Sequence, residues 1–207
     1  KDWAKAHLES DPHSFVLFNP LPHSFKGQVV IPKRLQGTSL LAADGTRLPT
    51  QSSGSLFFAT VDIPAFGFST LRKESDAPPG NTSANTKETL LENDRVRYEF
   101  DANGQLISAR LKAQPKHEWI HSQGAGNRLC LYNDDPTQWE AWDIDIHYLD
   151  EFVESARCLK MTRHCGPVFQ ELEMELAIGT STIHQRVRLA HHSARLDFVT
   201  EIDWCED

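Results

Sequence analysis

Residues 95–111, RVRYEFDANGQLISARL, constrain the fold of this chain more than any other stretch. In the first half, apolar residues alternate with charged ones, which is the pattern of a strand that buries one face; the apolar set is Val96, Tyr98 and Phe100. The dipeptide Asn103-Gly104 favours a tight hairpin turn, and a second alternating run follows at 106–111. The stretch therefore predicts an antiparallel hairpin that packs one face against another layer.

Similar strand-like patterns extend over most of the chain. Short runs rich in Val, Phe, Leu, Ile and Thr, separated by Gly, Pro, Asn and Asp, fill 13–74, and longer alternating runs occupy 169–204. This spacing is typical of β-sandwiches, and no long helix or internal repeat is evident. We expect an all-β chain with the tail of a preceding helical segment at 1–12, a small β-sandwich at 13–74, a linker or exposed loop at 75–88, and the first portion of a large antiparallel β-sandwich at 89–207.

Bulk properties exclude several classes of function. The formal charge of −8 argues against binding nucleic acid or an anionic membrane surface. No apolar run approaches the roughly 20 residues that span a bilayer, and the polar start is not a secretory signal. The first residue is not Met and the last residues follow a strand-like run, so we expect a fragment of a longer protein. The four cysteines lack a C-x-x-C spacing, which favours a reducing, cytoplasmic setting.

Residues 117–121, HEWIH, fit the H-E-x-x-H signature of zinc peptidases. That chemistry requires a helix that places both histidines on one face and the glutamate near the metal-bound water. Pro115, Gly124 and Gly126 leave room for two helical turns at most, so a solvated strand or hairpin arm between neighbouring strands is the preferred interpretation. On a strand, Glu118 faces away from the two histidines. A zinc peptidase remains a remote alternative.

Residues 127–151 contain the densest concentration of functional side chains. Four aromatic residues lie among five acidic ones: Tyr132, Trp139, Trp142 and Tyr148, with Asp134, Asp135, Glu140, Asp143 and Asp145. Aromatic rings beside carboxylates suit a sugar, because its C–H faces pack on rings while its hydroxyl groups bond carboxylates. A structural explanation is at least as good, because tryptophans also fill gaps between layers and Asp-Pro sequences form turns.

This stretch and three others, in order along the chain, resemble glycoside hydrolase family 38, the α-mannosidases. The matching pieces are N-R-L-x-L-Y-x-D-D-P-x-x-W-E-A-W-D-I at 127–144, F-N-P at 18–20, L-E-N with Y-E-F-D and G-Q-L at 91–106, and I-D-W at 202–204. The pattern is similar to the bacterial and cytosolic branch. The resemblance implies a small β-sandwich followed by part of a galactose-mutarotase-like supersandwich.

The resemblance also implies what the chain lacks. Family members have an N-terminal β/α catalytic domain and a helical bundle, hydrolyse α-mannosidic bonds with retention, and bind Zn²⁺ in the catalytic domain. None of the motifs for the nucleophile, general acid or zinc is present here. We therefore expect accessory β-domains that carry no cofactor, with the catalytic and helical domains of their own chain as partners and a mannose-containing glycan as ligand.

Four residues of the dense stretch are expected to lie near the sugar in the intact enzyme, because the family brings a loop of the large sandwich to the sugar site: Arg128, Asp135, Trp139 and Asp143. No catalytic or metal-ligating residue is expected. The alternative of a different class is a stand-alone carbohydrate-binding β-sandwich. An incomplete sandwich would expose an edge strand or an apolar face.

Overall fold

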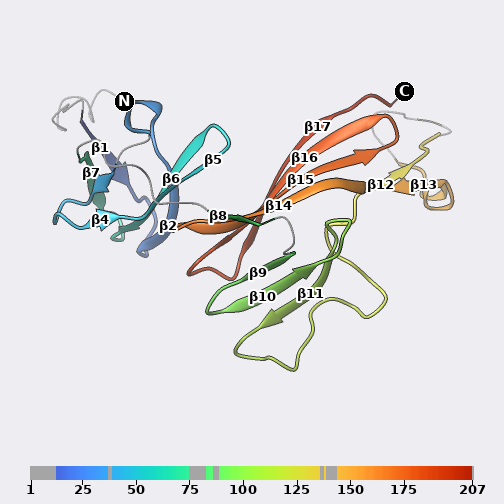
Figure 1. Ribbon diagram of the computed structural model, residues 1–207, viewed down its shortest axis with the longest axis horizontal. Coiled ribbons are helices and arrows are strands. Elements are labelled where there is room, and N and C mark those ends of the chain that lie inside the picture. The colour runs from blue at the N-terminus through green and yellow to red at the C-terminus, as the bar shows by residue number, and fades with distance from the viewer. Residues whose placement is uncertain are drawn as a thin grey trace. The chain divides into compact units, whose positions relative to one another are not determined.

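The computed structural model describes residues 13–36, 39–74, 83–85, 89–135, 138 and 144–206. These residues form strands joined by turns and loops, with two short 3₁₀ segments, η1 (Lys33–Leu35) and η2 (Ile146–Asp150), and no α-helix among them (Figure 1). The prediction of an all-β chain is confirmed. The predicted helical tail at 1–12 lies outside the described residues.

The chain divides into two compact units. The first contains the residues up to Ser83 together with Cys165–Phe169 and Ala190–His192, and the second contains the remainder. Within the predicted linker at 75–88, the described residues Ser83–Asn85 form a strand, β8. The two short insertions into the first unit come from segments more than 80 residues away in sequence, a long-range association that local sequence patterns do not reveal.

The first unit is built from two antiparallel sheets. One has the order β1-β7-β3-β4 and the other the order β2-β6-β5. Their strands are β1 (Ser14–Phe18), β2 (Phe25–Val30), β3 (Leu40–Leu41), β4 (Arg47–Leu48), β5 (Thr50–Ser53), β6 (Leu56–Ile63) and β7 (Phe68–Lys73). Alternate residues of β6 supply the core, where they pack with Leu40 and Leu71.

A buried asparagine fixes the turn after β1. The side-chain nitrogen of Asn19 donates to the carbonyl oxygens of His23, Ile63 and Pro64, and its side-chain oxygen accepts a hydrogen bond from the backbone N–H of Leu21. Asn19 is 3% exposed, so these bonds are necessary to compensate for the loss of water. Asn19 and Pro20 therefore form a turn in which the buried side-chain amide has all of these hydrogen-bond partners.

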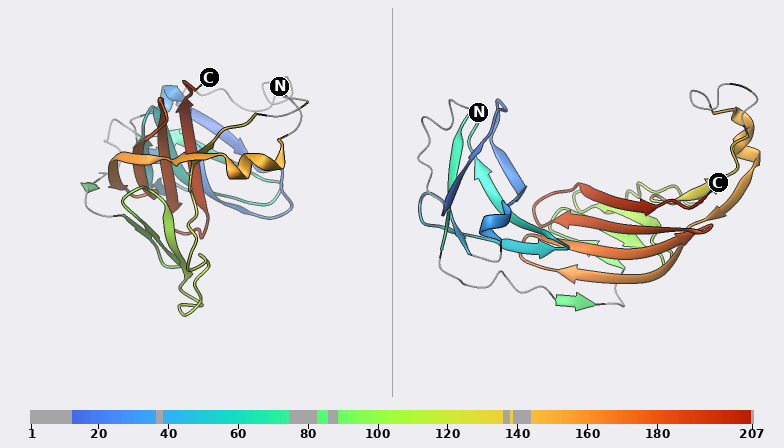
Figure 2. Two further views of the ribbon diagram at one scale, coloured as in Figure 1. Left: turned by 90° about the vertical axis from the view of Figure 1, so that its right-hand side faces the viewer. Right: turned by 90° about the horizontal axis from the view of Figure 1, so that it is seen from above.

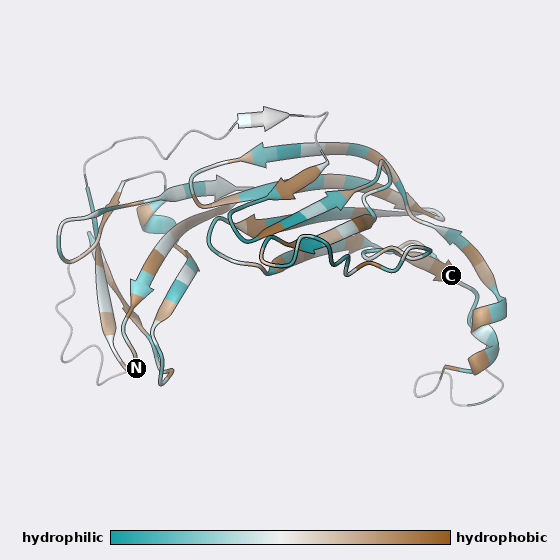
Figure 3. Ribbon diagram, turned by 90° about the horizontal axis from the view of Figure 1, so that it is seen from below, coloured by the Kyte–Doolittle hydropathy of each residue, from teal (hydrophilic) through white to brown (hydrophobic). Residues whose placement is uncertain are grey.

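The second unit is a two-layer β-sandwich. A three-stranded sheet, β11-β10-β9, faces a five-stranded sheet, β17-β16-β15-β14-β8, and a hairpin, β12-β13, stands beside them. Their bounds are β9 (Leu90–Glu92), β10 (Val96–Phe100), β11 (Leu106–Leu111), β12 (Cys130–Tyr132), β13 (Phe152–Ser155), β14 (Arg157–Cys165), β15 (Phe169–Ile178), β16 (Ser181–Ala190) and β17 (Leu196–Asp203). Hydrophilic and hydrophobic residues alternate along the strands (Figure 3).

The hairpin predicted from residues 95–111 is present. Strands β10 and β11 pair antiparallel from Val96 opposite Leu111, and both Val96 and Phe100 are buried in the sandwich core. Gly104 adopts φ +78° in the turn, where its N–H donates to the carbonyl oxygen of Asp101 at 3.1 Å. The core also contains alternate apolar residues of β15, within the alternating run predicted at 169–204: Leu172, Met174 and Leu176.

One strand of the large sheet leaves its apolar side open. In the register of β16 and β17, Phe198 lies opposite Val187 and Ile202 opposite Ile183. Residues directly opposite in an antiparallel pair share a face, so these side chains extend the core face. Yet Phe198 is 43% exposed and Ile202 53% exposed. The described part of the chain thus exposes an apolar stripe on β17, which is the feature expected of an incompletely covered sandwich.

Candidate functional site: the β12–β13 hairpin

The hairpin of β12 and β13, together with the connecting segment that includes η2, contains most of the described residues of the 127–151 stretch. Leu129 and Leu131 pack against the core of the sandwich. The intervening residues point the other way because side chains alternate along an extended segment. Arg128, which precedes β12, is exposed. The core-facing leucines therefore direct Arg128 and Tyr132 away from the core.

Three aromatic rings meet on this outer side. The ring of Tyr132 lies 5.3 Å from that of Tyr148 in η2 and 5.5 Å from that of Phe152 in β13, at interplanar angles of 76° and 71°. These edge-to-face contacts are the arrangement that aromatic pairs prefer. They connect β12, η2 and β13 into one surface with three rings, here called the hairpin aromatic cluster (Tyr132, Tyr148 and Phe152).

Arg128 extends this cluster with a cation. Its guanidinium carbon lies 5.8 Å from the centre of the Phe152 ring, and its Nε donates to Ser155 Oγ at 3.2 Å. A guanidinium held over a ring in this way still presents further N–H donors, in a planar fork suited to oxygen acceptors. Aromatic faces beside fixed donors can pack the C–H face of a sugar and bond its hydroxyl groups.

Several acidic residues are close in sequence to the ring-bearing residues. Asp134 and Asp135 are exposed shortly after β12, and Asp150 and Glu151 are exposed at the end of η2. Asp145 Oδ1 lies 3.9 Å from His147 Nε2 at the start of η2. These groups supply hydrogen-bond acceptors on the elements that carry the rings, whereas Arg128 supplies donors.

Two of the four predicted site residues can be placed. Arg128 and Asp135 flank β12, one before it and one after it, and both are exposed. Trp139 and Asp143 lie outside the described residues. The sequence did not indicate that Phe152 and Ser155 would join Arg128, because they are more than 20 residues away and reach it only through pairing of β12 with β13, in which Cys130 lies opposite Ser155.

The HEWIH segment is neither a helix nor a strand. The preferred interpretation was a solvated strand or hairpin arm, and the strand is not formed, because residues 117–121 are irregular. The backbone N–H of Trp119 still bonds back to the carbonyl oxygen of Ala109 in β11 at 3.1 Å. The segment also lacks the helix that a peptidase requires. The carboxylate of Glu118 bonds to residues of β11.

Glu118 is a structural acceptor. It accepts hydrogen bonds from Ser108 Oγ and the backbone N–H of Ala109, both at 2.7 Å, from Arg110 Nε at 3.0 Å, and from the N–H of Ile120 at 3.1 Å. Burial raises the pKa of Glu118, but these bonds outweigh it and lower the pKa to about 2. A carboxylate held ionised by this many donors is poorly suited to accept a proton from water at neutral pH.

The side chains that the structure describes do not provide a zinc site. No group of three or more His, Cys, Asp or Glu residues among them is close enough together to hold a metal ion. The described residues therefore do not form a binding site for the Zn²⁺ that the family resemblance implies, and no zinc ligand is assigned to them. Nor does any helix among the described residues have the length and apolar character needed to cross a membrane.

The fold and the hairpin together define an antiparallel β-sandwich that presents aromatic and charged side chains on one hairpin. Residues 91–207 match the family described as "Glycosyl hydrolases family 38 C-terminal domain", which is more than half of the chain. The chain belongs to this family. The match begins at the L-E-N motif of β9 and includes the whole 127–151 stretch.

Curated relatives support the assignment. The chain is similar to alpha-mannosidase G of Dictyostelium discoideum, with 24% identity over 176 residues, which cover 75% of this chain and 16% of the relative. It is also similar to human alpha-mannosidase 2C1, with 35% identity over 60 residues, which cover 29% of this chain and 6% of the relative. The chain thus spans less than a fifth of the length of either relative.

Proposed function

We propose that the chain forms accessory β-domains of a retaining α-mannosidase of the bacterial or cytosolic type, which stabilise the enzyme and complete its sugar site. The observation that carries the proposal is the family match over residues 91–207. The names of both relatives support an activity toward α-mannosides. On this proposal the substrate of the parent enzyme is a mannose-containing glycan or glycoside.

The hairpin aromatic cluster is the proposed contribution to the sugar site. Arg128 supplies N–H donors that are oriented by Ser155 and Phe152, and Asp135 supplies an exposed acceptor. Polar groups fixed in position beside aromatic faces orient a ligand at low entropic cost. Trp139 and Asp143 belong to the same proposal on the basis of sequence alone.

The chemistry itself is assigned to other domains of the same chain. A retaining glycosidase needs two carboxyl groups, one as nucleophile and one as general acid and base, that flank the scissile bond. We assign these groups, and the Zn²⁺ expected of the family, to a catalytic domain that would be the partner of the β-domains together with a helical domain. The present chain then carries no cofactor and is inactive alone.

A reducing, cytoplasmic location is part of the proposal. It is supported by the state of the thiols, since Cys130, Cys158, Cys165 and Cys205 are all free. Fractionation of the native host cells should recover the enzyme with the soluble cytoplasmic markers. Recovery with secreted proteins would overturn this part and leave the enzymatic part intact.

Hydrolysis of p-nitrophenyl α-D-mannopyranoside by the full gene product is the decisive assay. Activity is expected there and is not expected from the 207-residue chain alone, and zinc should be found by elemental analysis only in the full product. Arg128→Ala should lower kcat/KM about tenfold or more, as is usual for loss of a charged hydrogen-bonding group, while Arg128→Lys should keep part of it. A full gene product that binds mannose without hydrolysing any α-mannoside would instead indicate a stand-alone binding module.

A further inference from the structure

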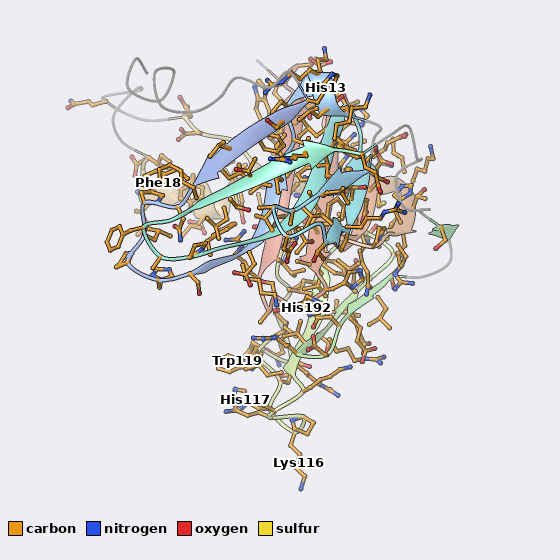
Figure 4. The ribbon with its side chains drawn as sticks, turned by 90° about the vertical axis from the view of Figure 1, so that its left-hand side faces the viewer. His13, Phe18, Lys116, His117, Trp119 and His192 are labelled. Carbon is orange, nitrogen blue, oxygen red and sulfur yellow. The ribbon has the colours of Figure 1, made fainter. Side chains whose placement is uncertain are left out.

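The loop after β11 presents an exposed tryptophan that the proposed function does not use. Trp119 is 57% exposed, and in Figure 4 it projects from the same end of the loop as His117 and Lys116. The ring of His117 lies 4.6 Å from that of Trp119 at an angle of 80°. The two rings therefore meet edge to face, while more than half of the Trp119 residue faces solvent.

The backbone on both sides of Trp119 is fixed. The carboxylate of Glu118 is held by β11, the N–H of Trp119 bonds to Ala109, and Ile120 packs against the sandwich core. Before them, two successive turns are closed by bonds from Gln114 N–H to Leu111 at 2.9 Å and from His117 N–H to Gln114 at 3.0 Å. A ring held on an ordered backbone is preorganised, so binding costs less conformational entropy.

A hollow lies beside this ring pair. It is lined by Gln114, Pro115, Lys116 and His117 and has a volume of about 410 Å³, which is within the range of small-ligand sites. The hollow is open to solvent and its walls are mainly apolar. Gln114, Lys116 and His117 are exposed, so their side chains can bring hydrogen-bonding groups to its edge. The hollow and Trp119 are together called the Trp119 platform (residues 114–117 and 119).

The combination favours one class of ligand. A pyranose ring has an apolar C–H face that can cover an indole and a rim of hydroxyl groups that require polar partners. The Trp119 platform offers one aromatic face and a polar rim, which is too little apolar surface for a stable protein interface. The platform and the hairpin aromatic cluster lie on different parts of the second unit, as the yellow-green loop and the orange hairpin show in Figures 1 and 2.

We propose that the Trp119 platform is a second carbohydrate-binding surface, on which a sugar residue of a glycan stacks on Trp119 and hydrogen-bonds residues of the adjoining hollow. It is separate from the hairpin aromatic cluster. Its role is to hold a polymeric or branched glycan near the enzyme, which raises the local concentration of sugar chains. Only the choice of mannose as the first probe rests on the proposed function.

Affinity electrophoresis of the full gene product through gels containing yeast mannan tests the proposal. The wild type should be retarded, and Trp119→Ala should weaken retention about tenfold in apparent Kd, as expected for loss of one aromatic stack, while Trp119→Phe stays near wild type. Trp204→Ala is the matched control because Trp204 is 59% exposed on the chain beyond β17. Hydrolysis of p-nitrophenyl α-D-mannopyranoside should be unchanged in all three variants.

The outcomes separate the two proposals. Retardation that is lost in Trp119→Ala, in a protein that hydrolyses no α-mannoside, would support the platform and contradict the proposed mannosidase function. Equal retention of wild type and Trp119→Ala, or an equal loss in Trp204→Ala, would overturn the platform. If mannan causes no retardation, gels with β-glucan, galactan and xylan follow, and failure of the wild type to bind all four polysaccharides also overturns it.

Discussion

Arg188 donates a hydrogen bond from Nε to Glu171 Oε2, and the two side chains are only 8% and 4% exposed. They lie on the adjacent strands β16 and β15. Removing two charges from water is costly, and their mutual attraction compensates for this cost only while both are present. Each charge therefore makes the burial of the other tolerable.

Loss of one member should be much worse than loss of both. Arg188→Met removes this cation from beside a buried carboxylate, so the free energy of unfolding should fall by about 3–5 kcal/mol, whereas Glu171→Met combined with Arg188→Met should cost far less. Urea denaturation of Arg188→Met, Glu171→Met and the double variant measures the difference. A double variant as unstable as the sum of the single variants would show that the pair is not coupled.

The sequence was sufficient to predict structural features that depend only on residues close together in the chain. The alternation of Val96, Tyr98 and Phe100 and the Asn103-Gly104 turn identified the β10–β11 hairpin because strand faces and tight turns are determined within a few residues. The role of Glu118 was not predictable in this way. Two of its donors are backbone N–H groups, which nearly every residue has, and two are the side chains of Ser108 and Arg110. Only the path of the loop brings all of them to one carboxylate.

The same difference between local features and long-range contacts holds for the candidate site. Arg128 and Asp135 were identified from residue type and motif. The exposure of Arg128 follows from alternation with the core-facing leucines, whereas Asp135 is exposed beyond the end of β12. The contact of Arg128 with Phe152 depends on which residues of β13 face β12, and a register shift between Leu131 and Tyr132 sets that pairing. Irregularities of this kind are not visible in a single sequence.

Glu118 should make the stability of the second unit depend on acid. Its pKa is lowered from 4.5 to about 2 in the fold, so its contribution is complete above about 4.5 and is lost as the pH falls toward 2. Glu118→Gln should lower the free energy of unfolding at pH 7 by about 1–3 kcal/mol, the usual value for hydrogen bonds to a charged group. Denaturant titrations at pH 7, 4.5 and 3 measure both effects.

The matched control for Glu118 is Glu175→Gln, on an exposed ion pair with Lys160. Exposed pairs contribute little, so this variant should change stability by less than about 0.5 kcal/mol. The wild type and the control should lose stability between pH 4.5 and 3 more steeply than Glu118→Gln. Parallel curves for all three proteins would contradict the role of Glu118.

Two glycines with positive φ separate backbone strain from steric crowding. Gly104 has φ +78° and an added Cβ would lie 2.5 Å from the sulfur of buried Met174, whereas Gly45 has φ +84° and nothing within 4 Å of an added Cβ. Gly45→Ala should cost about 1–2 kcal/mol from the left-handed conformation alone. Gly104→Ala adds overpacking and should cost about 2–5 kcal/mol. Equal losses in thermal or urea unfolding would contradict the crowding.

The apolar stripe on β17 should affect solubility more than stability. Phe198 and Ile202 are half exposed, so Phe198→Thr with Ile202→Thr in the 207-residue chain should change the free energy of unfolding by less than about 1 kcal/mol. Fewer exposed apolar side chains should reduce self-association and dye binding. Light scattering and 8-anilinonaphthalene-1-sulfonate fluorescence test this, with Thr182→Ser on the paired strand as control. Increased scattering in the double variant would contradict the prediction.

Trp139 and Asp143 provide the test of the sequence-based part of the sugar site. Trp139→Ala and Asp143→Ala in the full gene product should each lower kcat/KM for an α-mannoside about tenfold, the loss expected for one stacking or charged hydrogen-bond contact, while the melting temperature stays within a few degrees of wild type. Trp204→Ala and Asp203→Ala, on exposed positions at the end of the chain, are the controls and should keep full activity. If both site variants retain wild-type kcat/KM, the 127–151 stretch does not touch the sugar. If the variants lose activity together with their folded structure, Trp139 and Asp143 act in packing. That result would favour the structural explanation, in which these residues fill gaps between layers and form turns.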